Sequence, residues 1–380
     1  MKKRLLLFCV ILFMLFSLTG CYDSRGMDEI NIVSGIAVDK GEDGQYLLTL
    51  EIVDLSAKEN TGGTETMLVE SEGPTIFEAV RNSKLRLFNK LYFGNMHTLV
   101  VSQKLAREDG ITEIFEVFLR DVEPRENISV LISQEESARE LVTSEGIDAA
   151  NISHELNKIV FEDKNVASNT KQLELYEAYN MLYTEGHELV LPSFHLTNNG
   201  DKEIVEVSGI AIFKEDKLVS FLSPLDTHYF LIAAEDDAKG ALSFPSPKGD
   251  GYLVSVEVYG SKNKTKLSYT GGRLHVNVSI DIKLGVTENY TAPRNGLEPK
   301  ELTTALEDFL EIKTKEVFLQ LQENPGCDIY GYGEKMYEEQ YPLWQTLKGD
   351  WDAVFREAEF EVEISAGVVS TGLASGHHGE

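Results

Sequence analysis

The sequence predicts an α+β fold whose sheets are mainly antiparallel or mixed. Stretches rich in branched apolar residues, in which apolar and polar residues alternate, recur along the chain and predict strands. Between them lie segments whose apolar residues repeat at helical spacing. The chain has 380 residues, 42% of them hydrophobic, which is enough for two or three domains with their own cores.

Residues 21–135 are expected to form a first α/β domain. The predicted strands are 31–39, 46–53, 97–101 and 128–132, and the predicted helices are 74–90 and 110–120. Between the first two strands Asp43 precedes Gly44, a pair typical of hairpin turns. The order strand, strand, helix, strand, helix, strand indicates an α+β or mixed α/β domain.

Residues 136–203 predict a largely helical middle domain, and residues 204–370 a C-terminal α/β domain with an antiparallel sheet. In that last domain the predicted strands are 204–213, 218–222, 252–259, 264–269, 274–284 and 359–369. Helices are expected at 224–234 and 341–354, and a long helix is expected to begin at Glu298 and to stop at Asn324. Residues 371–380 are expected to be a disordered tail.

The N-terminus has the pattern of a secretory signal. Lys2, Lys3 and Arg4 precede an unbroken apolar run from Leu5 to Phe16. A membrane-spanning helix needs about 20 apolar residues, and this run is shorter. Residues 1–20 are therefore predicted to be a signal peptide.

The residues around Cys21 predict lipidation. The tetrapeptide Leu18-Thr19-Gly20-Cys21 resembles the bacterial lipobox, in which small residues let a peptidase bind the chain in extended form. The cysteine thiol would then accept a diacylglyceryl group, and two acyl chains suffice for stable anchoring. The alternatives are an uncleaved anchor and an ordinary signal peptide.

The charge of the chain excludes nucleic-acid binding. It has 63 acidic and 35 basic residues, and its formal net charge is −28. Such a protein repels phosphates, which supply most nucleic-acid affinity when basic residues neutralise them. It also repels anionic headgroups over about 8 Å at physiological salt. We therefore expect the membrane to hold it through the acyl chains rather than through overall charge.

No residue pattern predicts a catalytic, metal or cofactor site. His154 and His187 are each followed by glutamate, as in zinc proteases, but Lys158 and Leu191 stand where the second histidine belongs. Cys327 would have no disulfide partner if Cys21 is acylated. The sequence predicts a non-enzymatic protein, although a pair of glycosidase carboxylates among so many acidic residues stays open.

One segment stands out against the acidic background. The predicted helix at 74–90 has four basic residues, Arg81, Lys84, Arg86 and Lys90, in its second half. They are consistent with a solvated face that complements the helix dipole. The alternative is a surface that docks a partner or faces lipid headgroups, for which Arg81 and Lys84 are the candidate contact residues.

Both ends of the chain resemble the Ger(x)C spore germination lipoproteins. The starting residues Cys21-Tyr22-Asp23, Glu29-Ile30-Asn31 and Gly35-Ile36-Ala37-Val38-Asp39 resemble that family's Cys-Trp-Asp, Glu-Ile-Asn and Gly-Ile-Gly-x-Asp. Near the far end, Asp328-Ile329-Tyr330-Gly331-Tyr332-Gly333 resembles its Asp-Ile-Phe-Gly-Phe-Gly, with Trp351 further on. Here Tyr22 replaces tryptophan, Ala37 replaces glycine, and Tyr330 and Tyr332 replace phenylalanines.

The resemblance implies three α/β domains in series and a C subunit of a nutrient germinant receptor. Such subunits lie on the outer leaflet of the spore inner membrane and act with an A subunit and an integral-membrane B subunit. The family is not known for catalysis. The competing hypotheses are a lipid-anchored solute-binding protein, with two similar lobes around a cleft, and a cell-envelope hydrolase.

The motif residues have expected structural roles. Gly35 is expected to allow close backbone packing, and Asp39 to end its strand at a turn. At the other end of the chain Asp328, Gly331, Gly333 and Trp351 are expected to fix a turn and the core of the last domain. The alternative for this second group is a partner surface.

Overall fold

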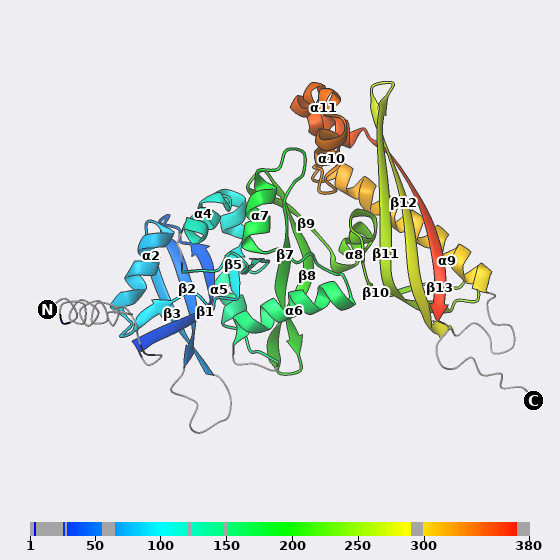
Figure 1. Ribbon diagram of the computed structural model, residues 1–380. Coiled ribbons are helices and arrows are strands. Elements are labelled where there is room, and N and C mark those ends of the chain that lie inside the picture. Colours follow the sequence, from blue (N-terminus) through cyan, green and yellow to red (C-terminus); the bar gives the residue numbers. More distant parts are fainter. Residues whose placement is uncertain are drawn as a thin grey trace, which may run out of the picture.

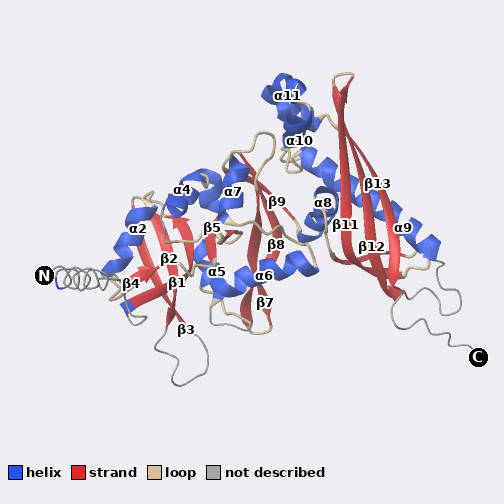
Figure 2. Ribbon diagram, in the orientation of Figure 1, coloured by secondary structure: helices blue, strands red, loops and turns tan. Residues whose placement is uncertain are grey.

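The computed structural model describes residues 29–54, 65–120, 123–147, 151–289 and 299–370, together with Arg4 and Gly26. These residues form two sheets covered by helices (Figures 1 and 2), which confirms the predicted α+β class. Apart from Arg4, the predicted signal peptide lies outside the described residues, as do Cys21 and the predicted tail at 371–380.

Within the described residues the larger sheet has nine strands in the order β3-β2-β1-β5-β6-β7-β8-β9, with β4 beside the start of β1. The strands are β1 (Ile30–Lys40), β2 (Tyr46–Asp54), β3 (Glu65–Gly73), β4 (Lys90–Tyr92), β5 (Thr98–Ser102), β6 (Ser129–Ser133), β7 (Val190–Asn199), β8 (Lys202–Lys214) and β9 (Lys217–Leu222). The sheet is mixed: β1, β5, β6 and β7 pair in parallel, whereas the strands at both ends pair in antiparallel fashion.

Helices bury both faces of the central strands. Ile36 and Val38 of β1 belong to the main core, whereas Ala37 between them belongs to a second core on the opposite face. The main-core face is covered by α2 (Ile76–Asn82), α3 (Gln103–Glu108), α4 (Thr112–Arg120) and α7 (Leu175–Leu182), and the opposite face by α5 (Ala138–Val142) and α6 (Ile152–Val166). Burial on both faces explains why β5 and β6 are apolar without alternation.

The smaller sheet has four strands in the order β10-β11-β12-β13. They are β10 (Gly240–Pro245), β11 (Leu253–Thr270), β12 (Arg273–Asn289) and β13 (Glu359–Ser370), and β12 and β13 pair in parallel. Its helices are α8 (Pro224–Ala234), α9 (Pro299–Glu323), α10 (Tyr332–Glu339), α11 (Tyr341–Leu347) and α12 (Trp351–Arg356), with a 3₁₀ turn η4 (Lys348–Asp350). Buried and exposed residues alternate along β10, so one face packs on α8 and α9 while the other is exposed (Figure 1).

The predicted helix at 74–90 is wrong in its second half. Helix α2 ends at Asn82 and continues as a single 3₁₀ turn, η3 (Ser83–Leu85), and the chain then enters β4. The Ser83 hydroxyl donates to the carbonyl of Val80 at 2.7 Å, which competes with the helical pattern. Residues 90–92 pair with the start of β1 instead. Long-range strand pairing therefore overrides the local helical spacing.

The two strands predicted at 252–259 and 264–269 are one continuous strand, β11. A bulge between Val258 and Gly260 lets the strand continue while it pairs with β12 along its whole length. Strands β3, β7 and β10 and helices α3 and α10 were not predicted individually. The larger sheet runs across the expected borders at 135 and 203, because β7 and β8 extend the sheet that β1 begins. The division into domains stays a prediction.

Candidate functional site

The Asp328 carboxylate lies at the centre of a buried cluster. It is 1% exposed and precedes α10. The backbone N–H of Tyr330 donates to its Oδ1 at 3.1 Å, and that of Gly333 donates to Oδ2 at 2.8 Å. The indole N–H of Trp351 also donates to Oδ2, at 3.1 Å. Asp328, Gly333 and Trp351, selected from the sequence, are thus in direct contact.

Glycines bring this cluster against the loop between α7 and β7. Gly186 in that loop has φ +81°, and a Cβ there would lie 2.5 Å from the carbonyl carbon of Gly333. A Cβ on Gly333 would in turn lie 2.7 Å from Gly186 Cα. Gly331 has φ +72°, and a Cβ there would lie 2.8 Å from His187 Nδ1. The two segments approach closely because the glycines at the contact have no side chain to keep the backbones apart.

Hydrogen bonds join the two sides of this contact. The backbone N–H of Glu334 donates to Gly186 O at 3.0 Å, and that of Glu188 donates to Asp328 O at 3.0 Å. The His187 ring Nδ1 lies 2.8 Å from Glu334 Oε2. We call the contact between 184–188 and 328–334 the Asp328 junction. It fastens the segment that begins α10 onto the loop that leads into β7 of the larger sheet.

Burial and hydrogen bonding act on the carboxylates of the junction in opposite directions. Burial raises the pKa of Asp328, although the bond from Gly333 N–H opposes that rise. The hydrogen bond with His187 lowers the pKa of Glu334. Both carboxylates are used by contacts within the protein, so the arrangement is suited to holding two parts together.

Gly35 and Asp39 of β1 each position a helix. Asp39 Oδ1 accepts a bond from Ala138 N–H at 2.8 Å, and its Oδ2 accepts from Arg139 N–H at 3.1 Å, at the start of α5. The role of this carboxylate therefore reaches beyond the local turn. A Cβ on Gly35 would lie 2.1 Å from Ser153 Oγ, so α6 packs directly on the backbone of β1.

Glu51 is a buried carboxylate that the sequence interpretation missed. It lies in β2 and is 1% exposed. Its Oε1 accepts from Ile152 N–H at 2.9 Å and its Oε2 from Ser153 N–H at 2.8 Å, so it caps the N-terminus of α6. The signal was a lone glutamate between Leu50 and Ile52 in an apolar strand. Nothing in the sequence pairs it with a helix a hundred residues away.

Arg81 and Lys84 lie at a groove between α2 and α4, far from the Asp328 junction. The groove has a volume of about 710 Å³. Apolar side chains and basic side chains from α2, β4 and α4 line it together, among them Phe77, Val80, Arg81, Lys84, Phe93 and Phe118. The guanidinium of Arg81 stacks over the Phe77 ring, 4.9 Å from its centroid. The groove is therefore apolar at its base and cationic at its rim.

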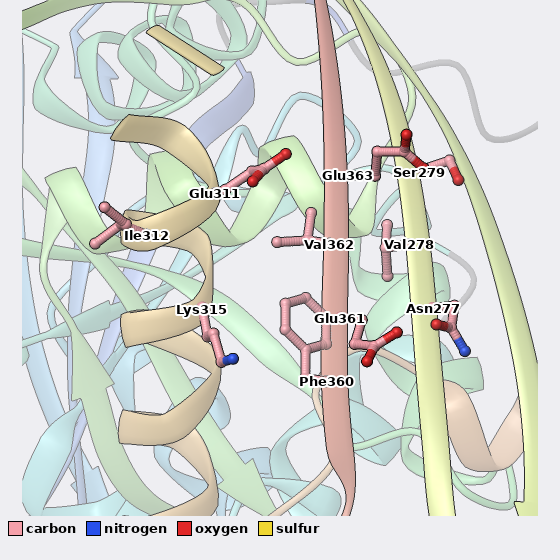
Figure 3. Close-up of a pocket in the computed structure, with 10 residues that line it drawn as sticks. All are labelled: Asn277, Val278, Ser279, Glu311, Ile312, Lys315, Phe360, Glu361, Val362 and Glu363. Atoms are coloured by element: carbon pink, nitrogen blue, oxygen red, sulfur yellow. The ribbon is translucent and has the colours of Figure 1, made fainter. Parts of the chain in front are cut away.

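A second hollow lies between α9 and the edge strand β13 (Figure 3). Its volume is about 460 Å³. Glu311 of α9 faces it, but Glu311 Oε1 accepts from Ile364 N–H of β13 at 3.0 Å. One turn earlier Glu307 accepts from Ala366 N–H at 2.8 Å. These two glutamates occupy the free donors of a sheet edge, and so they protect that edge from pairing with another chain.

A metal centre, a membrane-spanning helix and a reactive thiol are the remaining candidate features of the described ranges. There, no group of three or more His, Cys, Asp or Glu side chains is arranged to hold a metal ion. In the same part of the chain, no helix combines the length and the apolar character needed to cross a bilayer. Cys327 is buried and free, and burial raises the pKa of its thiol to about 12, which disfavours the reactive thiolate.

Two family models match almost the whole chain. Residues 23–196 match the model described as "Spore germination protein N-terminal domain". Residues 208–372 match the model described as "Spore germination B3/ GerAC like, C-terminal". The motifs at both ends of the chain that carry the resemblance fall inside these ranges, apart from Cys21 and Tyr22.

Similar proteins extend over the same length. Spore germination protein B3 of Bacillus subtilis (strain 168) is 25% identical over 372 residues, which cover 96% of this chain and 97% of that protein. Spore germination protein A3 of the same strain is 25% identical over 376 residues, covering 96% of each chain. Spore germination protein GerQC of Bacillus cereus is 24% identical over 374 residues, covering 96% of this chain and 98% of that protein.

A solved structure shares the fold. The crystal structure of the GerBC protein superposes with a TM-score of 0.58 at 20% identity, covering 88% of this chain and 97% of that chain. The likeness therefore extends over most of the fold. Taken with the two family models, it shows that this chain belongs to the Ger(x)C family of spore germination proteins.

Proposed function

We propose that this chain is the C subunit of a nutrient germinant receptor and is required, with integral-membrane A and B subunits, for germinant-triggered spore germination. The observation that carries the proposal is the length of the match. Relatives named as spore germination proteins align over 96% or more of this chain and over 96% or more of their own length. The protein acts by binding rather than by catalysis.

The lipid anchor is part of this proposal. Cys21 carries acyl chains that hold the protein on the outer leaflet of the spore inner membrane. Two arguments support it: the apolar run before the tetrapeptide ending at Cys21 is too short to span a bilayer, and the remaining chain has 32 basic against 63 acidic residues. A protein so acidic needs an attachment that does not depend on its overall charge.

The geometry of the sheets favours this proposal over a solute-binding protein. A solute-binding protein is expected to have two similar lobes around a cleft lined by converging polar groups. The described residues instead form one nine-stranded and one four-stranded sheet, which differ in strand order. The residues at the contact between the two parts are closely packed glycines and a carboxylate with three donors.

Co-purification from spore membranes tests the receptor proposal. An affinity-tagged copy is expressed under its own promoter, and dormant-spore membranes are solubilised in mild detergent. We expect multi-span membrane proteins to be recovered with the tagged chain, and spores that lack the chain to lose the response to one nutrient germinant. A chain that purifies alone, from growing cells only, contradicts the proposal.

Replacement of the proposed acylation site tests the anchor separately. Cys21→Ala is expected to remove the acyl mass from the protein. The variant is then either cleaved by another route and released from washed membranes, or left as an unprocessed precursor. Cys327→Ala is the matched control, because that thiol is buried and free, and it should leave acylation unchanged. Acylated Cys21→Ala protein would contradict the assignment.

A further inference from the structure

The turn between α2 and β4 exposes large apolar side chains beside cations. Phe88 is 99% exposed, Leu85 is 86% exposed and Phe77 is 54% exposed. Arg81, Lys84 and Arg86 are exposed among them. A group of large apolar side chains that the fold leaves exposed is typical of a surface that a protein partner or a membrane covers. We call these six residues the basic–aromatic surface.

Five of the six residues of this surface, all but Phe77, lie in a stretch of sequence that is free of acidic residues. Between Glu78 and Glu108 the chain has six basic residues and no aspartate or glutamate. The chain as a whole has nearly twice as many acidic as basic residues, so the local charge is opposite to that of the protein. Because this end is positive and the protein as a whole is negative, an anionic layer attracts this end and orients the protein toward it.

Several cations at this end keep their charge available. The Arg81 guanidinium stacks on the Phe77 ring, which carries no charge to neutralise it. Lys84 and Arg86 donate to the backbone carbonyls of Asn89 and Glu70, which do not neutralise them. Lys90 and Arg120, further back in the groove, pair with Glu123 and Glu116. The positive charge is thus concentrated at the exposed rim.

The start of the described chain lies at the same end. Ile30 begins β1 and pairs with Lys90 of β4, so the chain enters the fold next to the basic–aromatic surface. Cys21 precedes Ile30 by nine positions, a distance of at most about 30 Å in extended chain. Figure 1 shows α2 at the opposite end of the molecule from β11, β12 and β13. An anchor at Cys21 would bring this end, and not the other, to the bilayer.

We propose that the basic–aromatic surface docks on an anionic phospholipid bilayer, with Phe88 and Leu85 inserted at the level of the acyl chains and Arg81, Lys84 and Arg86 at the phosphates. The proposal rests on the acylation of Cys21 in the proposed function. Segments that lie at a membrane interface have the same arrangement: their cations contact the headgroups, and their aromatic and leucine side chains lie deeper in the bilayer. Docking fixes the orientation of the protein, which attachment through the acyl chains on Cys21 alone leaves free.

Depth-dependent quenching tests the docking on the full-length acylated protein. Phe88→Cys is labelled with bimane, an apolar fluorophore, in vesicles of phosphatidylcholine with and without phosphatidylglycerol. Cys21 is acylated and the Cys327 thiol is buried, so the introduced cysteine is the reactive one. We expect lipids brominated on the acyl chain to quench the probe at 88 at least about threefold more than a probe on Tyr341→Cys in α11, and more strongly when phosphatidylglycerol is present.

Charge reversal supplies the matched comparison. Arg81→Glu, Lys84→Glu and Arg86→Glu together are expected to abolish the phosphatidylglycerol-dependent quenching at 88. The same reversal at Lys262, Lys264 and Lys266, three exposed cations of β11, should leave it unchanged. Circular dichroism and the thermal midpoint check that both variants are folded.

The outcomes separate this inference from the proposed function. Vesicle-bound, acylated protein whose probe at 88 is no more quenched than that at 341 overturns the docking and leaves the anchor intact. Protein that is neither acylated nor retained on vesicles overturns the anchor itself. A third outcome combines two results: the probe at 88 is not quenched, and charge reversal at 81, 84 and 86 removes the co-purified multi-span proteins. This outcome overturns the docking and indicates that a protein partner binds this surface.

Discussion

The Asp328 junction and the basic–aromatic surface use charge in opposite ways. At the junction a carboxylate is removed from water and receives three hydrogen bonds from the protein. At the surface the cations stay exposed and lie among apolar side chains that the fold leaves uncovered. Residues of both regions are conspicuous in the sequence. The difference between the two regions shows that an unusual residue in the sequence can serve either to hold the fold together or to contact another molecule. Whether its side chain is buried or exposed distinguishes these two roles.

The largest effect is expected from Asp328→Ala. The variant leaves the N–H groups of Tyr330, Gly333 and Trp351 without their acceptor in a buried place. Each such group costs about 1–3 kcal/mol, so we expect a loss of about 3 kcal/mol or more. The urea midpoint of unfolding measures it, and Asp201→Ala in the exposed β7–β8 turn is the control. Equal midpoints for the two variants would show that the junction does not stabilise the fold.

A somewhat smaller loss is expected from Gly186→Ala. The residue has φ +81°, and the new Cβ would lie 2.5 Å from the Gly333 carbonyl carbon. The strained backbone alone costs about 1–3 kcal/mol. Gly349→Ala in η4 is the control, because no atom lies within 4 Å of its Cβ position. The prediction fails if both variants unfold at the same temperature.

Acid is expected to weaken the junction through Glu334. The bond with His187 lowers the pKa of Glu334 below its ordinary value of 4.5. Because the folded pKa is depressed, the stabilisation is present above the unfolded pKa and is lost as pH falls through the folded one. Glu334→Gln should therefore be less stable than the parent near neutral pH and should converge with it in acid. Thermal midpoints between neutral pH and pH ~3 measure this; a constant gap would contradict it.

Tyr332→Phe is expected to be neutral or slightly stabilising. The hydroxyls of Tyr330 and Tyr332 are buried and have no hydrogen-bond partner among the described residues. Their rings stack with centroids 5.0 Å apart, which phenylalanine would preserve. Removing an unsatisfied buried hydroxyl should change the free energy of unfolding by no more than about 1 kcal/mol in the stabilising direction. A clear loss in urea denaturation would indicate that the hydroxyl has a partner.

The smallest effect on stability is expected at the basic–aromatic surface. Reversal of Arg81, Lys84 and Arg86 changes exposed charges, and such substitutions usually shift stability by no more than about 0.5 kcal/mol each. The same three changes are expected to remove the contact with anionic bilayers. A large loss of stability in the urea midpoint would show that these cations hold the fold together, and the contrast with Asp328 would disappear.

The sequence by itself determined the elements whose signals are local. The Asp43–Gly44 hairpin, helix α8 and the final strand follow from turn residues, a proline at the start of the helix and alternation. The ordered motifs at both chain ends were sufficient for the family resemblance. Gly35, Asp39 and Asp328 were singled out through the motifs that carry this resemblance.

Only the tertiary structure decided what lies far apart in sequence. It ends α2 at Asn82, because the pairing of β4 with β1 outweighs the helical spacing of the next residues. It also brings Glu51 to the start of α6 and Gly186 to Gly333. The last two of these contacts join segments that are more than a hundred residues apart. The free energy of these contacts depends on side-chain packing and on the exclusion of water. A local sequence pattern cannot predict either of them.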